Sequence, residues 1–137
     1  MMNIRNIERA TQFYDYTGLM DGSIQPTDID GLFEYHNVGY VMIELKLTKK
    51  ELPTGQRISY ERLVKDTTIA GKKSVVFVVE HEVFDCKKPI IVKDCFVREM
   101  YFTDDLEWKK FRNKVNIRDL VKRYVSYLDK IEKVAKC

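Results

Sequence analysis

The sequence predicts an α/β domain in which a mixed sheet of roughly four to five strands is flanked by helices. Two apolar segments, 40–47 and 74–80, have the composition of strands that are buried on both faces. A segment with helical character separates them, and a long amphipathic pattern with a period close to 3.6 follows at the C-terminal end. Strands and helices that alternate in this way are typical of layered α/β folds.

Length and composition restrict the class of protein. A chain of 137 residues fits one domain, which we place at residues 1–137. With 45% hydrophobic and 33% charged residues, a packed core is expected rather than disorder. No segment approaches the roughly 18 consecutive apolar residues of a membrane helix, and no signal peptide or disulfide pattern is present. We therefore expect a cytoplasmic protein without a membrane partner.

The first elements expected along the chain are a helix and a β-hairpin. Apolar residues recur at helical spacing over 3–14. Gly18 and Gly22 then interrupt the pattern, and Pro26 excludes a regular helix after them. Segment 27–35 is an imperfect strand, and segment 40–47 is a clearer one. The short turn between them predicts antiparallel pairing.

The second half of the chain predicts the remaining layers. A helix is expected from Gly55 to about Asp66, followed by the buried strand at 74–80. Segment 90–102 is rich in strand-forming residues, and Asp104 could cap a helix that begins near Leu106. A final helix is expected from about Asn116, packed by its apolar stripe with lysines and arginines outward.

Charge is distributed unevenly. From Lys109 onward the chain has ten basic and three acidic residues, a net charge of +7, whereas the other residues sum to −4 and the whole chain to +3. The basic helical segment at 104–137 beside an anionic body suits a nucleic-acid partner. A solvated helix face is the alternative explanation of such a charge run.

An acidic motif lies on the predicted hairpin. Asp30 is near the start of the first strand, and Glu44 and Lys46 are near the end of the second strand, where residues two apart share a face. Two carboxylates and an amine would meet there. Gln56 and Tyr60 follow at the start of the next helix. A surface ion-pair cluster is the alternative for the acidic motif, and ordinary helix-start and core positions are the alternatives for Gln56 and Tyr60.

This ordered set resembles the PD-(D/E)xK nuclease superfamily. Asp30 matches the first acidic position, and Glu44-Leu45-Lys46 matches (Asp/Glu)-x-Lys. Residues 56–60 resemble the Gln-x-x-x-Tyr motif of the RecB-like branch. No histidine precedes His36, and the three cysteines do not reproduce the iron–sulfur ligands of some RecB-like members. The resemblance implies the restriction-endonuclease-like core.

The resemblance also implies a site chemistry. Mg²⁺ or Mn²⁺ would be held by oxygen ligands, and Lys46 would orient a water or stabilise transition-state charge, with Gln56 as a further catalytic residue. Nucleic acid would contact Tyr60 and three nearby cations. The expected metal ligands are Asp30, Glu44, the Leu45 carbonyl and, on the first helix, Glu8, for which a solvated position is an equal alternative; the expected nucleic-acid contacts are Tyr60, Lys49, Lys50 and Arg57.

The expected function is therefore a metal-dependent nuclease that acts on DNA and leaves a 5′-phosphate. The alternative is a catalytically silent nucleic-acid-binding or regulatory module with the same fold. A chain of this size covers little nucleic acid, so a homodimer or a larger assembly is also expected, by analogy with small resolvases and phage-type nucleases.

Overall fold

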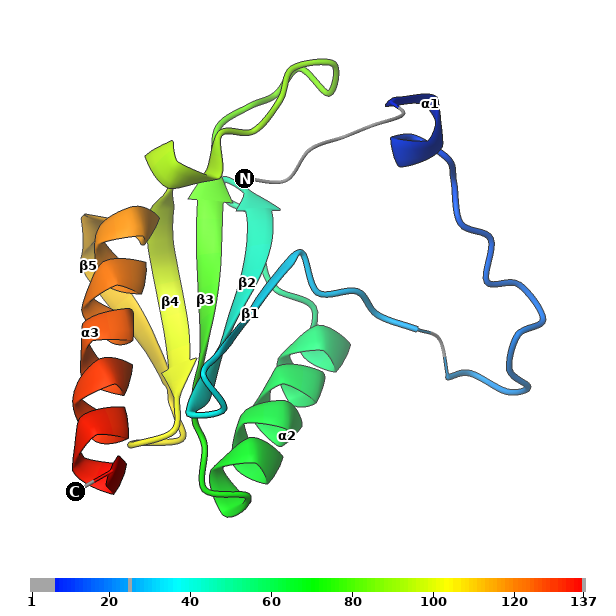
Figure 1. Ribbon diagram of the computed structural model, residues 1–137. Coiled ribbons are helices and arrows are strands. Elements are labelled where there is room, and N and C mark those ends of the chain that lie inside the picture. The colour runs from blue at the N-terminus through cyan, green and yellow to red at the C-terminus, as the bar shows by residue number, and fades with distance from the viewer. Residues whose placement is uncertain (1–6, 25, 137) are drawn as a thin grey trace.

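Five strands form a single sheet in the computed structural model, which describes residues 7–24 and 26–136 (Figure 1). Strands β2 and β3 are parallel, and all other neighbours are antiparallel, in the order β1-β2-β3-β4-β5. The predicted α/β class, with a mixed sheet and flanking helices, is confirmed. The elements are α1 (Ile7–Ala10), β1 (Gly31–Tyr35), β2 (Gly39–Leu47), α2 (Thr54–Ile69), β3 (Lys73–His81), the 3-10 turn η1 (Val92–Asp94), β4 (Phe96–Phe102), β5 (Trp108–Asn116) and α3 (Ile117–Lys136).

The two central strands, β2 and β3, are buried because a different helix covers each face of the sheet. Successive side chains of a strand point to opposite faces. On one face Phe77 of β3 belongs to an apolar cluster with Leu128 of α3. On the other face Val76 belongs to a cluster with Val64 of α2. We call these the α3 face and the α2 face, and the sheet is the middle of three layers.

Helix α2 makes the crossover between the two parallel strands. The register of β2 and β3 begins where Gly39 faces Lys73. A Cβ atom on Gly39 would lie only 2.0 Å from the Lys73 carbonyl oxygen, so this approach requires glycine. The continuous pairing that follows brings Glu44 opposite Val78, at the same end of the sheet as the start of α2.

A β-bulge near the start of β4 changes where its charged side chains point. Phe96 faces Glu80 and Glu99 faces Val78, so β4 has one more residue than β3 over this stretch. The extra residue is Arg98, whose guanidinium forms an ion pair with Glu80 at 3.2 Å. Both Arg98 and Glu99 are thereby directed to the α2 face.

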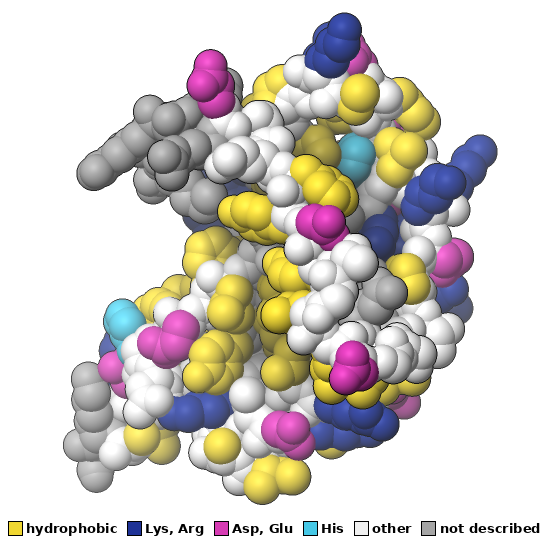
Figure 2. All heavy atoms as spheres, turned by 90° about the vertical axis from the view of Figure 1, so that its right-hand side faces the viewer, with side chains coloured by type: hydrophobic (Ala, Val, Ile, Leu, Met, Phe, Trp, Pro, Cys, Tyr) yellow, Lys and Arg dark blue, Asp and Glu magenta, His cyan; other side chains and the backbone are white. Residues whose placement is uncertain are grey.

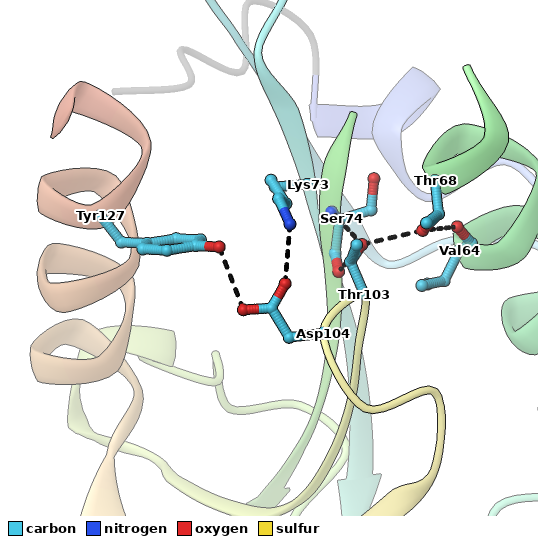
Figure 3. A network of polar contacts seen from close by, with 7 residues as sticks. All are labelled: Val64, Thr68, Lys73, Ser74, Thr103, Asp104 and Tyr127. Atoms are coloured by element: carbon cyan, nitrogen blue, oxygen red, sulfur yellow. Dashed lines mark hydrogen bonds and ion pairs between the residues drawn. The ribbon is translucent and has the colours of Figure 1, made fainter. Parts of the chain in front are cut away.

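A polar network joins the layers where α2 ends and β3 begins (Figure 3). The Thr103 hydroxyl of β4's C-terminal turn accepts a hydrogen bond from the Ser74 amide at 2.7 Å and lies 3.0 Å from the Thr68 hydroxyl of α2. Asp104 accepts hydrogen bonds from Lys73 at 2.8 Å and from Tyr127 of α3 at 3.1 Å. The network therefore connects both helices to the sheet.

Two N-terminal elements are shorter than predicted. Helix α1 ends at Ala10 rather than Tyr14, and its predicted start at Asn3 lies outside the described residues. Strand β1 begins at Gly31 rather than Thr27, because only from Gly31 onward does the chain pair with β2. The apolar spacing that predicted a longer helix does not face a core, since residues 10–24 are exposed.

The prediction of a helix near Leu106 is wrong, because this part of the chain is strand β5. Trp108, Phe111 and Val115 recur at helical spacing, which explains the error. In the structure β5 pairs with β4, and the register between them shifts within the strand. The basic segment at 104–137 therefore contains one edge strand and one helix, and the final helix at Ile117–Lys136 agrees with the prediction.

Residues 11–24 and 26–30, between α1 and β1, lie along one side of the molecule (Figures 1 and 2). Their exposed large hydrophobic side chains include Phe13, Tyr14, Leu19 and Ile24. Figure 2 shows this side, with hydrophobic side chains gathered near the middle of the view. Among the helices of residues 7–24 and 26–136, none has the length and apolar character that crossing a bilayer would require.

Candidate functional site

The candidate site is built where the β1–β2 hairpin meets the first turns of α2. Asp30 directly precedes β1, and one oxygen of its carboxylate accepts a hydrogen bond from the Leu45 amide at 2.7 Å. Glu44, which precedes Leu45 in β2, points to the α2 face, and only 2% of the residue is exposed to solvent. The hairpin therefore places one buried and one exposed carboxylate side by side.

Three side chains surround the Glu44 carboxylate. Gln56 donates a hydrogen bond to Oε1 at 3.1 Å, and the Tyr60 hydroxyl donates one to Oε2 at 2.6 Å. Lys46 lies two residues along the same strand, with Nζ 3.5 Å from Oε1. Gln56 and Tyr60 reach the same carboxylate because residues four apart share one face of a helix. The structure thus brings together Asp30, Glu44, Lys46, Gln56 and Tyr60, which the sequence predicted as one site.

Burial dominates the electrostatics of this site. Loss of solvent raises the pKa of Glu44 above its ordinary value, the Tyr60 hydrogen bond opposes this effect, and the charge of Asp30 adds to it. Burial and the adjacent carboxylate of Glu44 also raise the pKa of Tyr60, so its phenol stays protonated and remains a donor. A cation beside the two carboxylates would relieve their mutual repulsion.

The polar atoms of the site fit a hard divalent cation. Oε1 of Gln56 is buried, and no hydrogen-bond partner for it exists within residues 7–24 and 26–136. Two carboxylates and this amide oxygen are oxygen donors of the kind that Mg²⁺ and Mn²⁺ prefer. The assignment of oxygen and nitrogen in the Gln56 amide follows from its hydrogen bond to Glu44.

Replacing Tyr60 with phenylalanine tests the electrostatics of Glu44. The change removes the hydrogen bond that opposes the raised pKa of Glu44, so metal binding should require a higher pH. We expect Mn²⁺ affinity near pH 6 to fall by about tenfold, with a smaller effect at pH 8, in calorimetric titrations. Tyr40→Phe is the control. Tyr40 lies on the same face of β2 as Glu44, and its hydroxyl has no hydrogen-bond partner in the described ranges. Equal affinities at pH 6 for Tyr60→Phe and the wild type would contradict this account.

The predicted nucleic-acid contacts have different surroundings. Lys49 and Lys50 are exposed in the loop that joins β2 to α2. Arg57, in contrast, points into the structure: its guanidinium pairs with Glu99 and lies 4.4 Å from the centre of the Trp108 ring. In this arrangement Arg57 attaches the first turn of α2 to β4 and β5.

The buried charge of Glu99 was missed by the sequence analysis. Glu99 is fully buried on the α2 face. It faces Val78 of β3, which in turn faces Glu44 of β2. Its carboxylate is also 3.6 Å from the Arg98 guanidinium. The signal available in the sequence was the adjacent charged residues Arg98 and Glu99, inside a segment, 96–102, that otherwise has the composition of a strand. Buried carboxylates require such partners because desolvation of an unpaired charge is costly.

Glu8 is separate from the other predicted ligands. It lies on α1, is exposed, and belongs to a short helix that stands apart from the sheet in Figure 1. The structure therefore does not bring Glu8 to Asp30 and Glu44. Another group that could hold a metal is present at the β1–β2 turn, where His36 is 2.9 Å from Glu132 of α3 and Tyr35 donates a hydrogen bond to Asp129. These contacts already connect the turn to α3.

Comparison of the chain with protein-family models, with curated proteins and with solved structures finds no significant match. The contacts of the site itself are therefore the basis for a functional proposal.

Proposed function

We propose that the protein is a metal-dependent nuclease with a restriction-endonuclease-like core, and that it hydrolyses phosphodiester bonds in DNA. One observation carries the proposal: Gln56 and Tyr60 both donate hydrogen bonds to Glu44, beside Asp30. Glu44 belongs to one motif of the resemblance, and Gln56 and Tyr60 belong to the other. The sequence alone does not require these two motifs to meet.

Asp30, Glu44 and the Leu45 carbonyl would hold the metal. Mg²⁺ or Mn²⁺, when bound, supplies positive charge that acidifies a water and neutralises charge on the phosphate. The Tyr60 and Gln56 hydrogen bonds keep the Glu44 carboxylate in a fixed orientation, which reduces the rearrangement that metal binding requires. The buried amide oxygen of Gln56 is a further acceptor at the same place.

Lys46 is the cation of the site that remains partly accessible, with about 20% of its side chain exposed. From its position beside Glu44, its ammonium can donate hydrogen bonds to a phosphate oxygen or to the attacking water. Attack by the water oxygen on phosphorus would break the bond to the 3′ oxygen, which takes up a proton, and would leave a 5′-phosphate. We assign Lys46 the stabilisation of negative charge in this step.

Cleavage assays test the proposal directly. Single-stranded, duplex and branched DNA should be cleaved in the presence of Mg²⁺ or Mn²⁺, and Lys46→Ala should lower the rate by about 10²–10³-fold because it removes a donor for the developing charge. Lys65→Ala, an exposed lysine of α2, is the matched control and should leave the rate unchanged. The proposal fails if the wild type cleaves none of these substrates, or if Lys46→Ala is as active as Lys65→Ala.

A catalytically silent nucleic-acid-binding module is the second candidate. It is favoured by the fact that both Glu44 oxygens already have protein donors, which a purely structural carboxylate also needs. Calorimetry separates the two: a nuclease should bind Mn²⁺ in a manner that depends on Asp30, whereas the silent module should bind none. Asp30→Asn is the informative variant, and Asp28→Asn is its matched control.

A further inference from the structure

We propose that the α2 face of β5 is a second contact surface for the nucleic acid whose cleavage is proposed above; the inference rests on that function. The surface consists of Lys110, Arg112 and Lys114, which we call the β5 basic row. Lys110 faces Glu99, a residue of the α2 face. Lys114 lies over the ring of Phe96, which faces Glu80, and Arg112 is between Lys110 and Lys114 along the strand. All three are exposed, and none forms an ion pair with a carboxylate of residues 7–24 and 26–136.

A continuous set of neighbouring residues connects the β5 basic row to the candidate site. Lys46 of β2 faces Glu80 of β3, and Glu80 faces Phe96 of β4. Lys114 of the row lies over the Phe96 ring, 5.4 Å from its centre. Neighbouring strands are about 4.8 Å apart, so β2 and β5 are separated by about 14 Å, a length over which one strand of duplex DNA presents about four phosphates.

The β2–α2 loop places two further cations along this path. The guanidinium of Arg98 donates a hydrogen bond to the Lys50 carbonyl oxygen at 2.7 Å, which holds the loop against β4. Lys49 and Lys50 remain exposed there. A backbone bound at Asp30 and Glu44 and extending along this path would therefore meet positive charge on the loop and again on β5.

A hollow of about 500 Å³ beside the row offers room for a base. Its lining includes the rings of Phe96 and Phe111, and 39% of Phe96 is exposed. Its charged lining consists of three acidic residues and three basic ones, namely Glu80, Glu82, Asp94, Arg98, Arg112 and Lys114. The hollow is therefore nearly neutral and suits a base better than a phosphate. Phosphates would contact the basic row, and an unstacked base would stack on Phe96.

The distribution of charge on β5 distinguishes this surface from a simple protected edge. Edge strands often have lysines that prevent pairing with other chains. On β5, however, Lys109 points to the opposite face and its charge is used in an ion pair with Asp105. The cations without an ion pair are those on the face that contains the candidate site.

DNA binding measured by fluorescence anisotropy in EDTA tests the surface without cleavage. Arg112→Glu/Lys114→Glu should weaken the binding of single-stranded DNA by at least about tenfold near 100 mM salt. Arg112→Gln/Lys114→Gln should reduce the slope of log K against log salt concentration by about 1.4, because each phosphate contact to a single strand contributes about 0.7. Lys122→Glu/Arg123→Glu makes the same change of charge on α3, at exposed positions, and should weaken binding less than threefold. Phe96→Ala should lower the affinity for single-stranded DNA more than the affinity for duplex DNA.

The outcomes separate this inference from the proposed function. If the wild type binds and cleaves DNA and the β5 variants bind as it does, the surface is wrong and the nuclease proposal stands. Equal losses in the β5 and α3 double variants would also overturn the surface, because they would reveal only an effect of net charge. Absence of DNA binding and of cleavage in the wild type would overturn both.

Discussion

Replacing Glu44 with glutamine is expected to abolish metal-dependent cleavage and, at neutral pH, to raise the stability of the protein. Burial raises the pKa of Glu44, so the folded state binds a proton at this group more tightly than the unfolded state does. Stability therefore falls as pH rises through the ordinary glutamate range toward the raised pKa. Glutamine has no charge to desolvate and can still accept the Tyr60 hydrogen bond.

Denaturant titrations in EDTA measure the effect on stability. We expect Glu44→Gln to gain on the order of 1 kcal/mol at pH 7, with the gain disappearing in acid, where the wild-type carboxyl is protonated. Glu51→Gln, an exposed residue of the β2–α2 loop, should change neither stability nor activity. A Glu44→Gln protein that cleaves DNA normally, or that is less stable than the wild type at pH 7, would contradict the assignment.

Replacing Arg57 with methionine is expected to destabilise the protein by about 3 kcal/mol, because it removes the principal partner of the fully buried Glu99. The loss of the contact with the Trp108 ring acts in the same direction. Because Arg57 adjoins Gln56, the start of α2 should also become less ordered. Chemical denaturation measures the first effect, and hydrogen exchange of the α2 amides measures the second.

A double variant separates an ion pair from a nucleic-acid contact. Arg57→Met/Glu99→Gln should recover most of the lost stability, since no unpaired carboxylate is left buried. Arg62→Met, an exposed arginine on the same helix, should change stability by less than about 0.5 kcal/mol. If Arg57→Met keeps wild-type stability but binds DNA more weakly, the role of Arg57 is recognition, as the sequence predicted.

Much of the centre of the fold could be predicted because local and tertiary preferences agree there. Residues 40–43 of β2 and 75–79 of β3 are uninterrupted apolar runs, which a sheet covered on both faces buries. The faces of β2 were also correctly predicted, since the side chains of a strand alternate. Those two facts placed Glu44 and Lys46 on one face, and the structure brings Gln56 and Tyr60 to them.

The peripheral elements could not be predicted from local patterns. Trp108 and Phe111 have the spacing of a helix, and only pairing with β4 makes them part of a strand. The bulge that aims Arg98 at the α2 face is a property of two strands together. In the same way, Arg57 looked like a surface cation because its partner, Glu99, is distant in the sequence.

The candidate site is built from parts of the chain that are close in sequence, and this proximity has a consequence for folding. Its hydrogen bonds join residues only 12 to 16 positions apart. The entropy lost on closing such short loops is small, so the hairpin and α2 can assemble the site early, before β5 pairs and α3 docks. The acidic site would then form first, and the basic strand β5 and helix α3 would be added to the fold last.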